Sequence, residues 1–283
     1  LKTAIDPDGR IRTRYNIAGT STGRFSSSMS EFGTGGNLQN VEESLRAIFI
    51  SDRGYKFAKC DAKSGESYCV GAVEWNLFHD GKYLDAIESG DIHTAVARFT
   101  WPHLPWNGEK KHDRKIADEK FYRHLSRRDV CKKLGHGSSY GGKPQTLAEQ
   151  SRIPVDLVTD FQRKFFDTFP AIAYDPQSSL RDIVSTAMLR IWRKNYVTIV
   201  MDDHDALTFM YPEHLEDTII PQIQTDLIVE VPLAHGRVLR IPYDVEVGWN
   251  KGHYNEQTNP NGLKAYHGTD ARKRQETAGI LDR

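Results

Sequence analysis

The sequence predicts an α/β protein with two lobes, one mainly helical and one built on an antiparallel β-sheet. Three observations lead to this fold class. The chain has 283 residues, which exceeds the usual size of a single compact domain. Amphipathic helical patterns dominate residues 75–170, and short β-rich runs lie on either side of them. The runs at 196–201 and 206–211 flank the acidic segment DDHD and predict a β-hairpin.

Composition limits the kinds of protein that this chain can be. No apolar run approaches the roughly 20 residues that span a bilayer, and no signal-peptide pattern is present. We therefore expect a cytoplasmic protein that is neither secreted nor membrane-bound. The three cysteines show no CxxC spacing, which argues against a disulfide framework or a zinc site. The chain begins with Leu, which indicates a fragment or a trimmed chain.

Charge is sorted along the chain although the formal net charge is zero. Residues 109–133 hold ten Lys and Arg against five Asp and Glu, while residues 202–205 hold three acids in four positions. A zero net charge argues against a uniformly basic nucleic-acid-binding protein, but a partner responds to the local potential. A solvated helix face is the common explanation of either segment alone. The two segments together indicate more than a solvated surface.

The elements follow in order from the local patterns. Residues 1–50 are rich in Ser, Gly, Thr and Asn, which predicts ordered loop with short strands, or a linker. Residues 55–61, YKFAKCD, predict a strand that ends at Asp61, and the following ESYCVGAVEWNLF predicts a helix. Residues 237–249 add further strand, and residues 250–283 form a polar tail.

Two amphipathic helices are expected between these strands. Residues 155–169 place Leu157, Phe161 and Phe165 on one face at four-residue spacing. Residues 178–195 form the second helix. Its predicted buried stripe consists of Leu180, Ile183, Val184, Ala187 and Ile191.

Four residues within RRDVCKKLGHGSSYGG are spaced four apart: Arg128, Lys132, His136 and Tyr140. On a helix this spacing drifts about 40° and rises about 6 Å per step, so the side chains line one slowly turning face. The row is about 18 Å long, which roughly matches an extended nucleoside triphosphate. Two cations can hold phosphates, and a ring and a phenol can stack on sugar and base. An ordinary surface helix remains the alternative from spacing alone.

Acidic residues supply a complementary signal. Asp61 at a strand end and Asp205 at a hairpin tip converge if their strands share an antiparallel sheet. Clustered carboxylates suit divalent cations, and two Mg²⁺ ions about 4 Å apart can activate a hydroxyl and stabilise a leaving pyrophosphate. We therefore expect phosphoryl transfer with two Mg²⁺ ions, for which Mn²⁺ can substitute.

The order of the motifs resembles the family A (bacterial polymerase I-like) DNA polymerases over nearly the whole chain. The motifs are TGRFSSS with NLQN, DAKSGE, GDIHTA, RRDVCKKLGHGSSYG, PQSS, HDALTF and VEVGW. The corresponding family blocks include TGRLSS…NLQN, DYSQIE, RxxxKxxxFGxxYG and HDE. The resemblance implies a right-hand polymerase core, an antiparallel β-sheet palm with a helical fingers subdomain. Palm would be residues 1–71 and 176–249, fingers 72–175, and the polar tail 250–283.

The resemblance also implies a function, which is template-directed addition of dNTPs to a primer 3′-OH with release of pyrophosphate. Asp61 and Asp205 would bind the two metal ions, and Lys132 would be catalytic by protonating the pyrophosphate. The implied nucleotide-binding residues are Arg128, Lys132, His136, Tyr140, Glu66, His93 and Ser64. The implied DNA-binding residues are Arg24, Asn37, Gln39, Gln177 and His204.

Glu66 occupies the position of the family's steric gate, which excludes a ribose 2′-hydroxyl and hydrogen-bonds the Tyr of the fingers helix. Single-subunit RNA polymerases share this core but carry a small residue there, so Glu66 favours a DNA polymerase over that alternative. Three departures touch the implied site: His136 replaces Phe or Tyr, Ser64 replaces Gln, and Ala206 replaces Glu. They keep a non-catalytic duplex-DNA-binding remnant open as a second alternative.

Parts of typical relatives have no counterpart here. The connection at 170–177 is dozens of residues shorter, through a deletion or a missing loop, and no segment matches the thumb or the 3′→5′ exonuclease. We therefore expect a separate thumb or exonuclease chain, or an accessory replication protein, to act with primer-template DNA and dNTPs. Compact size and unusual motif substitutions favour a viral or phage origin, with the host cytoplasm as location.

Overall fold

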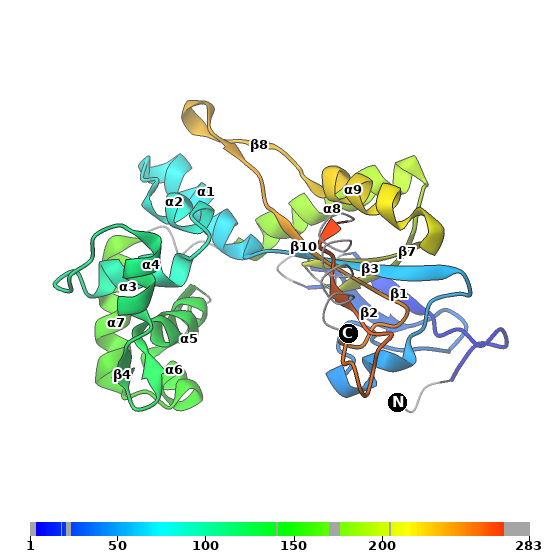
Figure 1. Cartoon of the computed structure of the whole chain (residues 1–283), viewed down its shortest axis with the longest axis horizontal. Helices are drawn as coiled ribbons and strands as arrows, with labels where there is room; N and C mark the ends of the chain where they lie inside the picture. The colour runs from blue at the N-terminus through cyan, green and yellow to red at the C-terminus, as the bar shows by residue number, and fades with distance from the viewer. Residues whose placement is uncertain are drawn as a thin grey trace, which may run out of the picture. The chain divides into compact units, whose positions relative to one another are not determined.

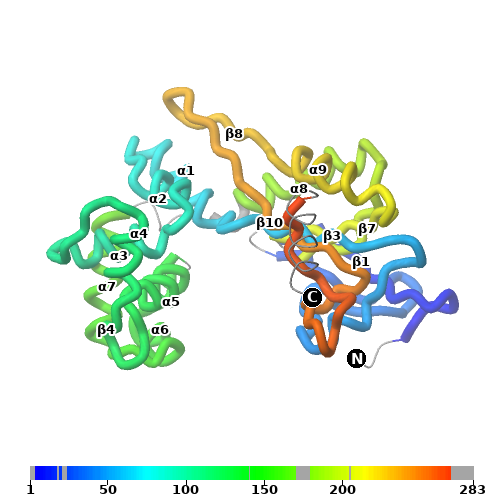
Figure 2. Tube along the Cα trace, viewed as in Figure 1, coloured from blue at the N-terminus to red at the C-terminus, as the bar shows by residue number. Residues whose placement is uncertain are grey.

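A computed structural model describes residues 4–17, 19–20, 24–139, 141–169, 176–203 and 205–268, without the side chains of 176–178. The chain divides into two compact units, and it enters the second of them twice (Figure 2). The sheet unit comprises Leu1–Gly65, Gln177–Val231 and Arg240–Arg283. The helical unit comprises Glu66–Pro176 and Pro232–Leu239.

Five antiparallel strands in the order β11–β10–β3–β7–β6 form the centre of the sheet unit (Figure 1). The strands are β3 (Tyr55–Ala62), β6 (Thr198–Asp203), β7 (Ala206–Pro212), β10 (Tyr243–Gly248) and β11 (Lys264–Ala265). The predicted strand at 55–61 and the predicted hairpin are confirmed. However, Asp202 and Asp203 lie within β6 and not at the hairpin tip, because Asp203 pairs with Ala206.

Other parts of the sheet unit complete its core. Helices α8 (Pro176–Lys194) and α9 (Glu216–Leu227) lie on one side of the sheet (Figure 1). The predicted buried stripe of α8 is confirmed at all five positions, and Leu207, Phe209 and Tyr211 of β7 are fully buried. Strands β1 (Thr13–Asn16) and β2 (Ser26–Met29) form a separate hairpin. Part of the segment expected as a polar tail is folded, since it supplies β11 and the buried Leu263.

The helical unit packs α3 against α5 and α7. Its helices are α1 (Gly65–Phe78), α2 (Lys82–Glu88), α3 (Ile92–Thr100), α4 (Lys110–Ala117), α5 (Arg127–Ser139), α6 (Pro144–Ser151) and α7 (Val155–Thr168). Strands β4 (Lys120–Tyr122) and β5 (Leu125–Ser126) form a hairpin between α4 and α5. The predicted helix at 155–169 is confirmed as α7, where Phe161 and Phe165 are buried. Leu157 is only half-buried, because the neighbouring Val158 takes the buried position.

The second passage of the chain through the helical unit, residues 232–239, is held by side chains of α1 and α2. It runs between β8 (Val231–Pro232) and β9 (Val238–Leu239). Trp75 Nε1 donates to the Ala234 carbonyl at 2.7 Å, and Arg237 Nη2 donates to Asp85 Oδ1 at 2.6 Å. Among the residues described here, no helix combines the length and apolar character needed to cross a membrane.

Backbone conformation at Ser64 gives a test of the turn that connects β3 to α1. Ser64 has φ 51°, in the left-handed region that costs a residue with a Cβ about 1 kcal/mol. We expect Ser64→Gly to stabilise the protein by about 0.5 kcal/mol after the greater chain entropy of unfolded glycine, and Ser64→Val to destabilise it by at least 1 kcal/mol. Thermal unfolding of the three proteins measures both. A Tm of Ser64→Gly below that of the wild type would contradict the left-handed conformation at Ser64.

Candidate active site

The two predicted metal ligands lie at the same end of neighbouring strands. Asp61 on β3 pairs with Ala206, the first residue of β7. Asp205 directly precedes Ala206, and its carbonyl accepts a hydrogen bond from the Ala62 N–H at 3.0 Å. The Asp61 carboxylate is 45% exposed, and Lys59 Nζ lies 3.2 Å from its Oδ2. The register of β3 with β7 therefore brings Asp61 and Asp205 to one end of the sheet.

The other two acids of the DDHD segment are paired with cations. Arg181 Nη2 lies 2.7 Å from Asp202 Oδ2, and the two side chains are only 3% and 4% exposed. Lys251 Nζ lies 2.5 Å from Asp203 Oδ2. Burial lowers the pKa of Lys251, although Asp203 acts in the opposite direction. Because separating a buried ion pair is costly, Asp202 and Asp203 hold β6 in place and are poor candidates for metal ligands.

The chemistry of the remaining donors fits a hard divalent cation. Asp61 and Asp205 offer carboxylate oxygens, and Mg²⁺ is commonly held by one or two carboxylates together with water and substrate phosphates. Within the described parts of the chain, no group of three or more His, Cys, Asp or Glu could hold a metal ion. The sheet unit thus offers two carboxylates and would rely on a substrate for further ligands.

Two predicted DNA-binding residues flank a buried anchor in the sheet unit. Leu38 is buried, and its N–H donates to a serine hydroxyl of β2 at 2.9 Å. Asn37 is exposed on one side of this anchor. On the other side, Gln39 Nε2 donates to the Asp202 carbonyl at 3.1 Å, which ties it to the strand that leads to Asp205.

The remaining predicted DNA-binding residues are only partly described. Arg24 is half-buried and lies two residues before β2. Gln177 falls on α8, but its side chain is outside the described set. His204 and the nucleotide-binding Tyr140 both lie outside the described residues.

Three members of the predicted row lie on α5 in the helical unit. Arg128 is half-buried, and Lys132 and His136 are exposed. Leu134 is fully buried, which fixes the rotation of the helix. The polar row of α5 is therefore presented away from the core of the helical unit.

A carboxylate that the sequence analysis did not single out joins three helices. Asp91 is the N-cap of α3 and accepts hydrogen bonds from Thr94 N at 3.3 Å and Thr94 Oγ1 at 2.8 Å. It also accepts from Arg128 Nε of α5 at 3.1 Å and from Arg114 Nη1 of α4 at 2.8 Å. No described residue binds the two terminal nitrogens of Arg128. Asp91 therefore holds Arg128 from the side and leaves its two terminal nitrogens for another anion.

Burial and the neighbouring charges shift the ionisation of two groups in this network, Asp91 and His93. Burial alone would raise the pKa of Asp91, but hydrogen bonds from Thr94 and Arg114 and the charge of Arg128 keep it below its ordinary value. Burial, followed by the charge of Arg128, lowers the pKa of His93 to about 4, although Asp91 opposes this. His93 is therefore neutral at pH 7 beside a fixed arginine.

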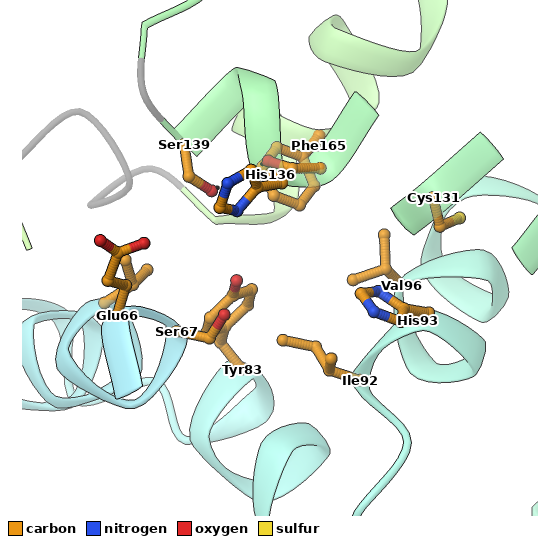
Figure 3. Close-up of a pocket in the computed structure, with 12 residues that line it drawn as sticks. Glu66, Ser67, Tyr83, Ile92, His93, Val96, Cys131, His136, Ser139 and Phe165 are labelled. Carbon is orange, nitrogen blue, oxygen red and sulfur yellow. Dashed lines mark hydrogen bonds between the residues drawn. The ribbon is translucent and has the colours of Figure 1, made fainter. Parts of the chain in front are cut away.

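A small pocket in the helical unit brings further predicted residues together (Figure 3). Glu66 and Ser67 of α1 lie on one side of it, His136 and Ser139 of α5 on another, and the Tyr83 hydroxyl points between them. Burial raises the pKa of Tyr83 to about 12 despite hydrogen bonds with Ser67 and Ser139. The cavity is about 60 Å³, room for about two water molecules. It is too small for a nucleotide but places Glu66 and His136 around one space.

Two departures from the family pattern have simple structural settings. Ser64 is exposed in the turn between β3 and α1, two residues before Glu66. Ala206 is 2% exposed and lies opposite Asp61, where it provides no third carboxylate.

Comparisons with known proteins identify the family of this chain. The family model for DNA polymerase family A matches residues 1–175, and the chain belongs to this family. A thermostable DNA polymerase I of Thermus aquaticus is 28% identical over 185 residues, which cover 60% of this chain and 19% of that protein. DNA polymerase I of Rhizobium leguminosarum is 30% identical over 172 residues, or 58% and 14% of the two chains. This chain therefore aligns with less than a fifth of these relatives.

A solved structure shows the same fold. The POL domain of Pol1 from M. smegmatis, in complex with DNA primer-template and dNTP, matches with a TM-score of 0.63 at 20% identity. The match covers 86% of this chain and 48% of that domain. The predicted mixed α/β fold with an antiparallel sheet is therefore confirmed.

Titration of His93 provides a test of the Asp91 network. We expect its NMR titration midpoint near pH 4, because burial and the charges of Arg128, Lys132 and Arg114 outweigh Asp91. Between pH 6.5 and 4 the unfolded state then binds a proton that the folded state does not, so stability falls as pH falls. His93→Gln should flatten this dependence by up to about 1 kcal/mol per pH unit. A midpoint near 6.5 would contradict the network.

Proposed function

We propose that this chain is a template-directed DNA polymerase, with the sheet unit as palm and the helical unit as fingers. The observation that carries the proposal is the β3–β7 register, which places Asp61 opposite Ala206, the residue directly after Asp205. Membership of DNA polymerase family A supports it, as does the presentation of Arg128 and Lys132 on α5. Such an enzyme works where DNA and dNTPs are present, in the cytoplasm or nucleoid.

In the proposed reaction the primer 3′-oxygen attacks the α-phosphorus of a dNTP. A new P–O bond forms, the bond to the bridging oxygen breaks, and pyrophosphate leaves. Arg128, fixed from the side by Asp91, and Lys132 hold the phosphate oxygens, and Lys132 donates a proton to the pyrophosphate. His93, neutral at pH 7, adds a hydrogen bond. Two Mg²⁺ ions at Asp61 and Asp205 would lower the hydroxyl's pKa and stabilise developing charge.

The other predicted residues have supporting roles in this proposal. Glu66 selects the deoxyribose, while His136 and Tyr140 stack beside the sugar and base, and Ser64 lies in the adjoining turn. The primer-template is held by polar side chains of the sheet unit. These are Arg24, Asn37, Gln39, Gln177 and His204.

Removal of either predicted metal ligand tests the proposal. We expect Asp61→Asn and Asp205→Asn each to slow single-nucleotide primer extension with Mg²⁺ by at least about a hundredfold, because charge at the reacting phosphate is no longer stabilised. Affinity for the primer-template, measured by fluorescence anisotropy, should stay within about threefold in both variants.

Asp244→Asn is the matched control for this experiment. Asp244 lies directly opposite Asp61 on β10, its side chain is 67% exposed, and its only ion-pair partner among the described residues is Lys63 at 3.7 Å. We expect this variant to extend the primer at near wild-type rate. A wild-type chain that binds the primer-template but never extends it would support the non-catalytic alternative and reject a polymerase.

Sugar selection tests the role of Glu66. We expect wild type to prefer dNTPs, and Glu66→Ala to incorporate ribonucleotides more readily by at least about tenfold relative to dNTPs, because a clash with the 2′-hydroxyl is removed. The ratio of kcat/KM for the two sugars measures this. Ser67→Ala, which removes a neighbouring side chain of the same pocket, serves as control. Equal use of both sugars by wild type would contradict the gate and favour an RNA polymerase.

A further inference from the structure

The basic segment between α3 and α5 carries cations outside the proposed active site. Five exposed cations lie on it, of which Lys110 donates to the Ser89 carbonyl at 3.1 Å. The other four are Lys111 and Lys115 on α4, and Lys120 and Arg123 on the β4–β5 hairpin. We call these four residues the basic surface. Lys111 and Lys115 are one helical turn apart and rise about 6 Å along α4.

The acids of this segment are almost all engaged elsewhere. Asp113 is 1% exposed and accepts hydrogen bonds from two backbone N–H groups of the preceding loop. Asp118 accepts from Arg114 Nε at 2.5 Å, and Glu119 accepts from Arg127 Nη1 at 3.2 Å. None of the four cations of the basic surface has a carboxylate partner within 4 Å among the described residues. Because most acids of this segment are engaged with arginines or backbone N–H groups, the four lysine and arginine side chains give the exposed surface an excess of positive charge.

The two halves of the basic surface belong to one packed substructure. Arg127 Nη1 donates to the Ile116 carbonyl at the end of α4 as well as to Glu119, so the first residue of α5 holds the α4–β4 connection. The β4–β5 hairpin packs against α5. At the hairpin tip the Arg123 guanidinium lies over the Tyr122 ring, 5.2 Å from its centroid. The surface therefore combines fixed cations with a partly exposed aromatic ring.

The character of this surface indicates its partner. Protein interfaces have apolar centres with large hydrophobic anchors. Between residues 100 and 154, no exposed large hydrophobic side chain occurs in the described part of the chain. Unpaired Lys and Arg beside a stackable ring are instead the features that bind single-stranded nucleic acid, since phosphates meet the cations and unpaired bases meet the ring.

We propose that the basic surface binds single-stranded nucleic acid, contacting its phosphates through all four cations and a base through Tyr122. None of its residues belongs to the α5 row or to the pair Asp61 and Asp205. A paired base cannot reach the ring, so we expect a duplex to bind this surface more weakly than a single strand does.

Salt-dependent binding of the full chain to a fluorescein-labelled oligodeoxythymidine, without dNTP or metal, tests the site. Each phosphate contact contributes about 0.7 to the slope of log K against log salt for a single strand. We expect Lys111→Gln/Lys115→Gln and Lys120→Gln/Arg123→Gln each to reduce the slope by about 1.4 and to weaken binding at least tenfold at low salt. Tyr122→Leu should weaken binding with an unchanged slope.

Arg163→Gln/Lys164→Gln is the matched control, since it makes the same change in net charge on α7 of the same unit. Both residues already pair with Asp160, Arg163 Nη2 at 2.8 Å and Lys164 Nζ at 2.7 Å. The control should keep the wild-type slope. An equal loss in the control would mean that net charge alone matters and would overturn the site.

Other ligands distinguish the remaining outcomes. Equal weakening of binding to a blunt duplex would overturn single-strand selectivity, and displacement of the oligonucleotide by polyglutamate at equal charge concentration would favour an acidic protein partner. Wild-type binding to the oligonucleotide without any primer extension would contradict the proposed polymerase while leaving the basic surface supported.

Discussion

The antiparallel pairing of β3 with β7 is the constraint on which the chemistry of the sheet unit depends. A shift of one residue would turn Asp61 to the opposite face of the sheet and change its pairing with Ala206, the residue directly after Asp205. The register is held by apolar burial, since Cys60 and its partner Leu207 are both inaccessible to solvent. The buried ion pair of Asp202 with Arg181 and the partly buried pair of Asp203 with Lys251 fix β6 beside them. Two acids therefore secure the hairpin that carries a third.

In the helical unit, charged side chains likewise form hydrogen bonds with one carboxylate, that of Asp91. One buried carboxylate caps α3, contacts α4 through Arg114 and steadies Arg128 on α5. His93 follows on the capped helix, so its position relative to Arg128 depends on the same group. Elsewhere in this unit the acids Asp118 and Glu119 are engaged with nearby arginines, which leaves exposed lysines uncompensated. The excess of basic residues seen along this segment of the sequence is therefore more pronounced on the surface of the folded unit.

Sequence patterns predicted the elements with strong periodicity and the residues inside ordered motifs. The α8 stripe, the β3 strand and the Arg128–Lys132–His136 row follow from local spacing and needed no tertiary information. Asp91, Arg181 and Lys251 were missed because their roles depend on partners distant in sequence. Weak signals existed: Asp91 precedes a helix as an N-cap would, and Arg181 follows the first residue of an apolar stripe. The pairing of Asp202 and Asp203 could not be inferred, since their partners Arg181 and Lys251 lie far away in the sequence.

The claim that Asp61 and Asp205 form the metal site is tested most directly by counting bound ions. Electron paramagnetic resonance of Mn²⁺ can be recorded on the chain with a primer-template ending in a dideoxynucleotide and the next dNTP. The account predicts two Mn²⁺ in the active site of each complex, one of which the dNTP also binds in solution, so the complex holds one Mn²⁺ more than the dNTP and DNA bind alone. This number should fall in Asp61→Asn and in Asp205→Asn and stay unchanged in Asp244→Asn. Wild-type stoichiometry in both Asp61→Asn and Asp205→Asn would contradict it.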